Sequence, residues 1–350
     1  MESSTTPGNG PQAESNGNII ESHESHATQV DDKVDTFPAP LEQRNADHKH
    51  VEEQRLRAWG DGVIPTDIAI ENDGFSIVSA EPFGNSAWSV TGKLIANDLN
   101  ESRTTKTMFV KISYGETGRV MLLGECKSSK IIHKLMADFI PKPLEYGKFE
   151  KADIPTYFYM SEFVDLDTTT AQDPSEFCKL LAEMHRKSQT LLDIKRNGTW
   201  PEYERPAHQV AEPSLIHGDL WEGNTGINKD TNLPILSDAG SYFAHNEMEL
   251  GHWACEFSTI FGNKVYTDRY LESFPKTEPA EDFEDRIRLY SLKGGMNYSA
   301  GHPRSQLRTS AYNSMLYLCE KYAPIDGIGN YDESIDPIHT GARIVPHAEI

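Results

Sequence analysis

The chain has 350 residues, of which 37% are hydrophobic, so it can bury a core as one two-lobed domain or as two small domains. Its 33 basic and 54 acidic side chains give a formal net charge of −21, which argues against nucleic acid or anionic membranes as partners. An acidic protein can still bind a nucleotide, because a divalent metal and one or two placed cations neutralise the phosphates.

The cysteines are widely spaced without a Cys-x-x-Cys pair, which argues against a zinc site or a disulfide framework and favours reduced core thiols: Cys126, Cys178, Cys255 and Cys319. The first residues lack the apolar segment of a signal peptide, and no apolar run approaches the length of a membrane span. We therefore predict a cytoplasmic protein, and a monomer.

Residues 1–50 are mainly polar with almost no aromatic side chain, a composition that cannot offset the entropy of ordering, so they are predicted to be a disordered tail. Four histidines in or near this tail have no ordered scaffold on which to bind a metal: His23, His26, His48 and His50. A weak helical pattern follows at 51–59, and a nucleotide-binding sheet lobe is predicted for 55–165.

That lobe is predicted to open with a strand at 75–80 and a strand, turn and strand over 83–94. Small residues at the turn, Gly84, Asn85 and Ser86, would let backbone N–H groups approach a phosphate closely. An ordinary hairpin turn explains the same residues. A Walker-type Gly-Lys-Ser/Thr is absent from the sequence, which excludes a P-loop NTPase.

Lys111 lies in an apolar strand at 107–113, where an ammonium is costly unless it meets an anion. Glu125 follows in a helix predicted for 118–138. A strand lysine paired with a glutamate on the next helix is how kinases direct a cation at the α- and β-phosphates of ATP. The alternative is an edge-strand lysine beside an unrelated surface glutamate.

The segment Ile140–Pro143 breaks the chain, and two strands follow. The second, at 156–164, suits a hinge between lobes whose backbone could bind adenine at Glu162, Phe163 and Val164, although a core strand accounts for the same pattern. A helix is predicted for 174–185, with His185 packing in the core rather than acting in catalysis.

The residues with the clearest chemistry lie between 215 and 238. Asp219, Asn224 and Asp238 supply a carboxylate that can accept a hydroxyl proton, together with an amide oxygen and a second carboxylate that can hold magnesium. Kinase catalytic loops have the spacing His-x-Asp-x-x-x-x-Asn, which His217 also fits. The alternative, that the acid and amide merely cap a loop, is disfavoured by the hairpin at 225–236 that leads to Asp238.

Beyond Asp238 the chain turns from loop into helix, and Glu247 and Glu249 are placed to brace the catalytic loop or to touch substrate. A linker at 275–282 and helices at 281–290 and 307–322 follow. The C-terminal lobe is thus predicted to cover 166–330, and 331–350 to be a flexible tail.

At family level, the sequence resembles the fructosamine/ketosamine-3-kinases, a branch of the aminoglycoside-phosphotransferase-like kinases, and in particular their fungal members. The most specific motif is His-Gly-Asp-Leu-Trp-Glu-Gly-Asn at 217–224, supported by Asp238 and the segment 243–251. Shorter matches extend the resemblance over roughly residues 60–320: Gly84–Thr91, Phe109–Lys111, Gly124–Glu125, His185–Ser188 and Leu289–Leu292.

The resemblance implies an α+β, protein-kinase-like fold, with an antiparallel sheet lobe carrying one helix and a larger, mainly helical lobe. It implies ATP-dependent phosphorylation of the sugar 3-hydroxyl of ketosamines, on small amines or on lysines of glycated proteins, which makes the adduct labile and reverses glycation. Asp219 would be the base, Asn224 and Asp238 the Mg²⁺ ligands, Lys111 the phosphate clamp and Glu125 its partner.

The chain departs from this family between 186 and 216. Only 31 residues separate His185 from His217, where family members carry a longer helical stretch, so the C-terminal lobe is predicted to be shortened. Lys293-Gly294-Gly295 also replaces an Arg-Phe-Asn-like segment. Two alternatives therefore stand beside a ketosamine kinase: a non-catalytic nucleotide-binding pseudokinase, and a kinase of the same fold acting on another alcohol or amine in specialised metabolism.

Overall fold

The computed structural model describes residues 75–343, except for 85, 87, 99–103, 150–151, 153, 200–211 and 302–304. The predicted tail at 1–50, its histidines, the helical pattern at 51–59 and Asn85 lie outside the described residues. So does part of the segment between 186 and 216 that is predicted to be shortened.

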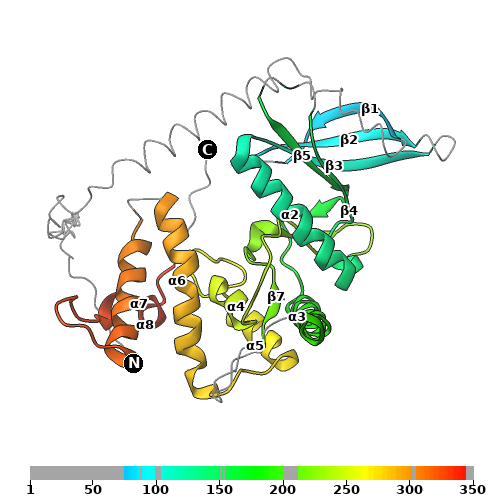
Figure 1. The fold of residues 1–350 in the computed structure, drawn as a ribbon. Coiled ribbons are helices and arrows are strands. Elements are labelled where there is room, and N and C mark those ends of the chain that lie inside the picture. Colours follow the sequence, from blue (N-terminus) through cyan, green and yellow to red (C-terminus); the bar gives the residue numbers. More distant parts are fainter. Residues whose placement is uncertain are drawn as a thin grey trace, which may run out of the picture. The chain divides into compact units, whose positions relative to one another are not determined.

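The N-terminal lobe is built on a five-stranded antiparallel sheet in the order β1-β2-β3-β5-β4 (Figure 1). The strands are β1 (Phe75–Pro82), β2 (Val90–Asp98), β3 (Thr105–Tyr114), β4 (Pro143–Lys148) and β5 (Thr156–Glu162). Alternate residues of β3 bury Met108, Val110 and Ile112 in the core of this lobe, because successive side chains of a strand point to opposite faces. The other face of β3 is therefore left to carry Lys111.

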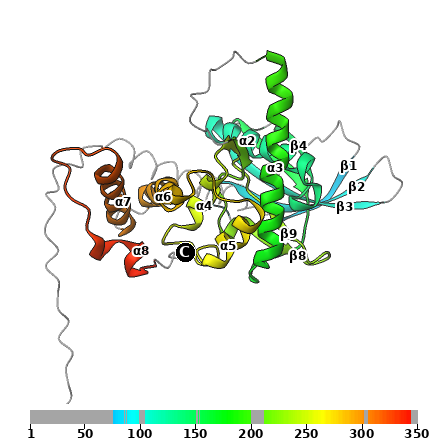
Figure 2. The same cartoon turned by 90° about the horizontal axis from the view of Figure 1, so that it is seen from below.

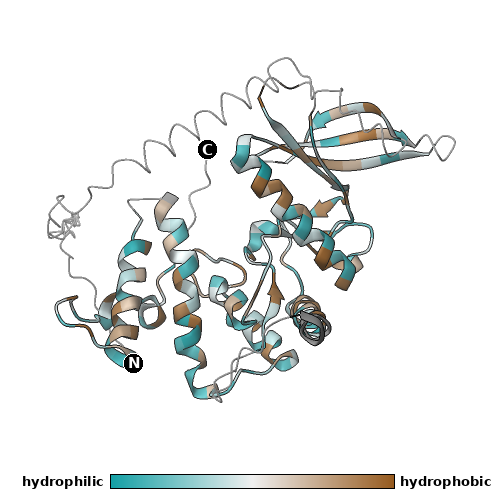
Figure 3. Cartoon of the chain, viewed as in Figure 1, coloured by the Kyte–Doolittle hydropathy of each residue, from teal (hydrophilic) through white to brown (hydrophobic). Residues whose placement is uncertain are grey.

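One helix of the described residues, α2 (Gly115–Leu135), follows β3 directly and packs against β3, β4 and β5. It carries both hydrophobic and hydrophilic residues (Figure 3), as expected of a helix with one face against a sheet. Leu122 and Cys126 pack with Tyr159 of β5. The helix begins three residues earlier than the predicted 118–138, because Gly115, at φ +63°, turns the chain sharply out of β3. It also ends three residues earlier, at Leu135.

The C-terminal lobe is mainly helical. Its α-helices are α3 (Pro174–Thr199), α4 (Glu247–Trp253), α5 (Lys264–Ser273), α6 (Phe283–Gly301), α7 (Leu307–Tyr322) and α8 (Pro337–Thr340). Figure 2 shows α6 and α7 side by side and α5 next to α3. The 3-10 turns are η1 (Ala137–Phe139), η2 (Glu222–Asn224), η3 (Ala280–Asp282) and η4 (Glu333–Ile335).

Short strands of this lobe position the candidate site. They form two small antiparallel sheets, β6-β8-β9 and β10-β7. The strands are β6 (Leu166–Asp167), β7 (Ser214–Ile216), β8 (Thr225–Asn228), β9 (Pro234–Leu236) and β10 (Tyr242–Ala244). The predicted α+β class, with a sheet lobe that carries a helix and a larger helical lobe, is confirmed.

Several predicted boundaries differ from the structure. The helices predicted for 174–185 and 281–290 continue to Thr199 and Gly301, and α5 was not predicted. The predicted tail from 331 instead contains η4 and α8, because buried Asp336 pairs with Arg288 of α6 at 2.7 Å. No helix among the described residues is both long and apolar enough to span a bilayer.

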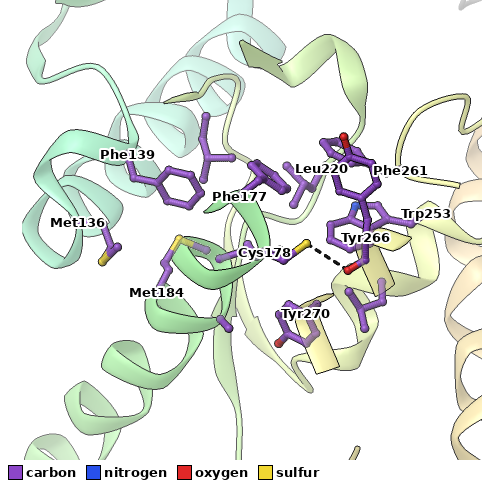
Figure 4. Close-up of a cluster of buried hydrophobic side chains, with 14 of the residues drawn as sticks. Met136, Phe139, Phe177, Cys178, Met184, Leu220, Trp253, Phe261, Tyr266 and Tyr270 are labelled. Carbon is purple, nitrogen blue, oxygen red and sulfur yellow. Dashed lines mark hydrogen bonds between the residues drawn. The ribbon is translucent and has the colours of Figure 1, made fainter. Parts of the chain in front are cut away.

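An aromatic core joins α3, α4 and α5 (Figure 4). The ring of Phe177 stacks on Phe261 with centroids 5.0 Å apart, and Trp253 stacks on Phe261 at 5.1 Å. Met136 and Phe139, which follow α2, belong to the same cluster. The end of the N-terminal lobe is therefore packed into the core of the C-terminal lobe.

We expect Phe177→Ala to lower the free energy of unfolding by about 3–5 kcal/mol, because it removes a fully buried ring from a core that can collapse only in part. Urea denaturation followed by circular dichroism measures this loss. Val120→Ala, at an exposed position of α2, is the control and should change stability by less than about 0.5 kcal/mol. Equal effects of the two substitutions would contradict this account of the core.

Candidate active site

A buried ammonium group connects the two lobes. Lys111 of β3 is 6% exposed, and its Nζ lies 2.9 Å from Oε1 of Glu125 on α2. The same ammonium forms an ion pair with Asp238, which follows β9 in the C-terminal lobe. The predicted pairing of Lys111 with Glu125 is therefore present, and Asp238 joins it.

The protonation of this trio follows from burial and charge. Burial acts to lower the pKa of Lys111, but the carboxylates of Glu125 and Asp238 outweigh it and leave the pKa raised, so the ammonium stays charged. Burial raises the pKa of Glu125, and the negative charge of Asp238 adds to this effect, while the attraction of Lys111 opposes it without outweighing it. One cation thus faces two carboxylates, and a further positive charge would relieve their repulsion.

The catalytic loop begins at the end of β7. The amide of Asn224 donates to the backbone carbonyl of Asp219 at 2.8 Å and to its carboxylate Oδ2 at 3.1 Å. Gly218 has φ +86°, and a Cβ there would lie 2.4 Å from the carbonyl oxygen of Gly240, so the turn before Asp219 requires glycine. The half-buried carboxylate of Asp219 is thus held by Asn224 through one of its two oxygens.

Asp238 is brought beside this loop by backbone contacts. The N–H of Ser237 donates to the carbonyl of Asn224 at 2.9 Å, and a ring nitrogen of His217 lies 2.8 Å from the carbonyl of Ser237. Asp238 itself has φ +56°, a left-handed conformation that non-glycine residues seldom adopt. The structure thus brings together Asp219, Asn224 and Asp238 as the sequence predicts.

Glu249 of α4 holds the catalytic loop through backbone hydrogen bonds. Its carboxylate accepts the N–H of His217 and, at 3.1 Å, the N–H of Gly218, and it lies 3.6 Å from Nε2 of His185. Burial acts to raise the pKa of Glu249, but the hydrogen bonds and the neighbouring histidines leave it lowered. The buried His185 therefore supports the carboxylate that holds the loop.

Glu247, the other predicted brace, is used elsewhere. It accepts the N–H of Thr277 at 2.8 Å and Nε of Arg286 at 2.7 Å, so it secures the segment before α6. Glu222, which the sequence analysis did not single out, accepts the N–H of Phe261 at 3.1 Å and the hydroxyl of Ser258 at 3.0 Å. Its position within the motif at 217–224 could have indicated a structural role for Glu222.

In the predicted hinge, one of the three backbone N–H groups has no backbone acceptor among the described residues. The N–H of Glu162 donates to Lys142 at 2.8 Å and that of Phe163 to Thr107 at 3.3 Å. Within the described chain, the N–H of Val164 donates to no backbone carbonyl. Val164 is therefore the one of the three predicted residues whose N–H is available to a base.

The predicted phosphate-binding turn lies beside the strand pair that carries Lys111. Gly84 has φ +78°, and a Cβ there would be 3.6 Å from Oγ1 of Thr91, the residue paired with Lys111 across β2 and β3. The hydroxyl of Ser86 accepts from the hydroxyl of Ser89 at 3.0 Å. Among the described residues, the side-chain hydrogen bonds of Lys111 go to Glu125 and Asp238 and not to Gly84 or Ser86.

Two cavities of several hundred Å³ lie apart from the charged groups around Lys111 and Asp219. One of about 450 Å³ is lined by residues of α4 to α8, and one of about 720 Å³ lies by the starts of α3 and α5. Neither is lined by a predicted site residue. The converging charged groups, and not the size of a cavity, therefore define the candidate active site.

Part of the chain is similar in sequence to a known family of kinases. Residues 201–314, which include the catalytic loop, Asp238, all of α6 and the first half of α7, match the fructosamine kinase family model. A chloroplastic protein-ribulosamine 3-kinase from Oryza sativa subsp. japonica is 28% identical over 256 residues, or 57% of this chain and 70% of the relative. Ketosamine-3-kinase from Mus musculus is 35% identical over 105 residues, or 29% of this chain and 30% of the mouse protein.

Spectinomycin phosphotransferase APH(9)-Ia, in complex with ADP and spectinomycin, aligns at a TM-score of 0.45 and 12% identity over 74% of this chain and 94% of that one. The sequence matches support the family resemblance: residues 201–314 match the fructosamine kinase family model, and the chain is similar to the ribulosamine and ketosamine 3-kinases.

We expect Glu249→Gln to destabilise the protein by about 2–3 kcal/mol at pH 7, because two buried N–H groups lose a charged acceptor. The folded-state pKa of Glu249 lies below its ordinary value of 4.5, so its stabilisation is present above that value and is lost as the pH falls through the folded pKa. Urea unfolding of the wild type and of Glu249→Gln at pH 7 and pH 4 measures the destabilisation and its dependence on pH.

In that experiment the gap in stability between wild type and Glu249→Gln should narrow toward pH 4. The exposed Glu281, replaced by glutamine, is the matched control and should change stability by less than about 0.5 kcal/mol at either pH. A gap that stays constant or widens on acidification would show that Glu249 does not brace the loop as a carboxylate.

Proposed function

We propose that the chain is an ATP-dependent kinase that phosphorylates the sugar 3-hydroxyl of ketosamines and so takes part in deglycation. The observation that carries this proposal is the convergence of Asp219 and Asn224 with the Lys111–Asp238 ion pair. The homologous segment 201–314 contains three of these four residues. The acceptors are ribulosamine or fructosamine adducts of small amines or of protein lysines.

In this proposal Asp219 acts as the base. Its carboxylate accepts the proton of the sugar hydroxyl while that oxygen attacks the γ-phosphorus of ATP, and the bond to the β,γ-bridging oxygen breaks to release ADP. Asn224, which donates to the same carboxylate, keeps one oxygen of Asp219 occupied and leaves the other toward the acceptor. Lys111 holds the phosphates, positioned by Glu125.

The residues present fit a magnesium ion. Asn224 uses its amide nitrogen toward Asp219, so its side-chain oxygen faces away, and Asp238 is exposed with one oxygen engaged by Lys111. Both are hard oxygen donors of the kind that Mg²⁺ prefers. Bound there with the nucleotide, the ion would neutralise the phosphate charge and the carboxylate repulsion around Lys111.

Nucleotide binding in this proposal extends from the turn at Gly84, Asn85 and Ser86 to the hinge. The available N–H of Val164 is the donor that would meet adenine, while Phe163 packs its ring on Phe83, 5.0 Å between centroids. The hinge backbone is thereby held against the sheet. A cytoplasmic monomer needs no further component for this chemistry.

We expect Asp219→Asn to lower kcat on ribulosamine or fructosamine acceptors by about 10²–10⁴-fold, because the general base is lost. ATP affinity should change by less than about threefold, since the phosphate and hinge contacts remain. Coupled ADP-release assays and calorimetric titration with ATP measure these quantities.

Asp230→Asn, in the exposed turn between β8 and β9, is the control and should retain wild-type kcat. An unchanged kcat in Asp219→Asn would refute the role of the base. Intact ATP binding with no turnover of any ketosamine by the wild type would instead favour the pseudokinase, and turnover of a different alcohol would favour a kinase of specialised metabolism.

A further inference from the structure

A second cation reaches the catalytic loop from the side of the helical lobe. Lys293 of α6 donates from its Nζ to the backbone carbonyl of Gly218, the residue directly before Asp219. The same ammonium lies 5.3 Å from the ring centroid of Tyr242 on β10. Because α6 packs on α4, Lys293 approaches Asp219 from a different part of the protein than Lys111 does.

The charge of Lys293 is available to a ligand. Its side chain is exposed, and among the residues that the structure describes no carboxylate forms an ion pair with it. The two contacts it does make, a carbonyl oxygen and an aromatic face, leave a full positive charge beside the base. In a chain with a net charge of −21, such a cation without an ion-pair partner among the described residues, next to the catalytic loop, favours an anionic partner.

The surroundings limit that partner to a single negative charge. A small pocket by the loop is lined by Gly218, Tyr242, His252 and Lys293 among others. Burial lowers the pKa of His252, although the nearby charge of Asp219 opposes this, so the imidazole is neutral at pH 7. With one cation and the carboxylate of Asp219 close by, a monoanion such as a carboxylate fits better than a phosphate dianion.

Exposed aromatic rings also occur on the loop and on β10, and one of them, Tyr242, lines the same small pocket as Lys293. Trp221, Tyr242 and Phe243 are 40%, 36% and 36% exposed, and all three lie in the loop or in the strand paired with β7. Amphipathic rings of this kind pack against the apolar faces of sugars and amine side chains. The acceptor side of Asp219 thus combines apolar surface with one positive charge.

We propose, building on the function proposed above, that Lys293 binds a carboxylate of the acceptor. The enzyme then prefers ketosamines formed on the α-amino group of a free amino acid. In those adducts the carboxylate lies two bonds from the ketosamine nitrogen, close to the sugar. In an adduct on a lysine side chain of a protein, the four-carbon stem separates the sugar from a neutral peptide group, so Lys293 gains no charged partner.

The test compares two acceptors that differ only in charge, ribulosyl-glycine and ribulosyl-glycinamide, with wild type and Lys293→Met. For the wild type, kcat/KM should be at least about tenfold higher for the carboxylate, mainly through KM, as for a charge-assisted hydrogen bond. In Lys293→Met the two values should become equal within about threefold, with the glycinamide little affected. Lys293→Arg should restore the preference.

The exposed Lys127 of α2, replaced by methionine, is the control and should keep the wild-type preference. The inference is overturned if the wild type uses both acceptors equally. It is also overturned if Lys293→Met loses activity on both to the same extent, which would make the lysine a support of the loop or of the phosphates. If the wild type phosphorylates neither acceptor nor any other ketosamine, the proposed function fails, and this inference with it.

Discussion

One ammonium held between two carboxylates is the interaction on which the candidate site depends. Lys111 can remain buried and charged only because Glu125 and Asp238 are both within reach, and these come from a helix of one lobe and a loop of the other. Removing either carboxylate would leave the rest of the trio poorly compensated. These ion pairs therefore link the two lobes at the point where a triphosphate would bind.

Three further carboxylates, of which Glu247 and Glu249 are buried, shape the loops around that point. Glu249, Glu247 and Glu222 each accept backbone N–H groups from segments that have no regular secondary structure to satisfy them. Each of these carboxylates thereby supplies an acceptor for backbone N–H groups that have none in a sheet or helix. The rigidity of the site is thus obtained from side chains on short helices and turns, while the sheets near the loop are only two or three strands wide.

The sequence was sufficient where local pattern and chemistry agree. The spacing of Asp219, Asn224 and Asp238 is the one that phosphoryl transfer requires. The apolar residues that alternate around Lys111 indicate that this lysine needs an anionic partner. The sequence was insufficient where contacts are distant. The carboxylate of Asp238 on Lys111 joins residues 127 positions apart, and Lys293 stood out only as a departure from the family pattern, since its carbonyl partner lies on another element. The extension of α3 and α6 likewise depends on tertiary packing, which propensity does not encode.

The pairing of Arg288 with Asp336 has a practical meaning for anyone who shortens or fuses this polypeptide. Arg288 lies on the same helix as Lys293, five residues earlier, and its guanidinium also rests 4.2 Å from the ring of Tyr317. Trimming the chain ahead of 336 would strand a guanidinium in an apolar setting and loosen the helix that delivers the acceptor-side cation. A protein that ends before Asp336 would on this basis have an altered choice of acceptor, even with the sheet lobe and every residue of the catalytic motif in place.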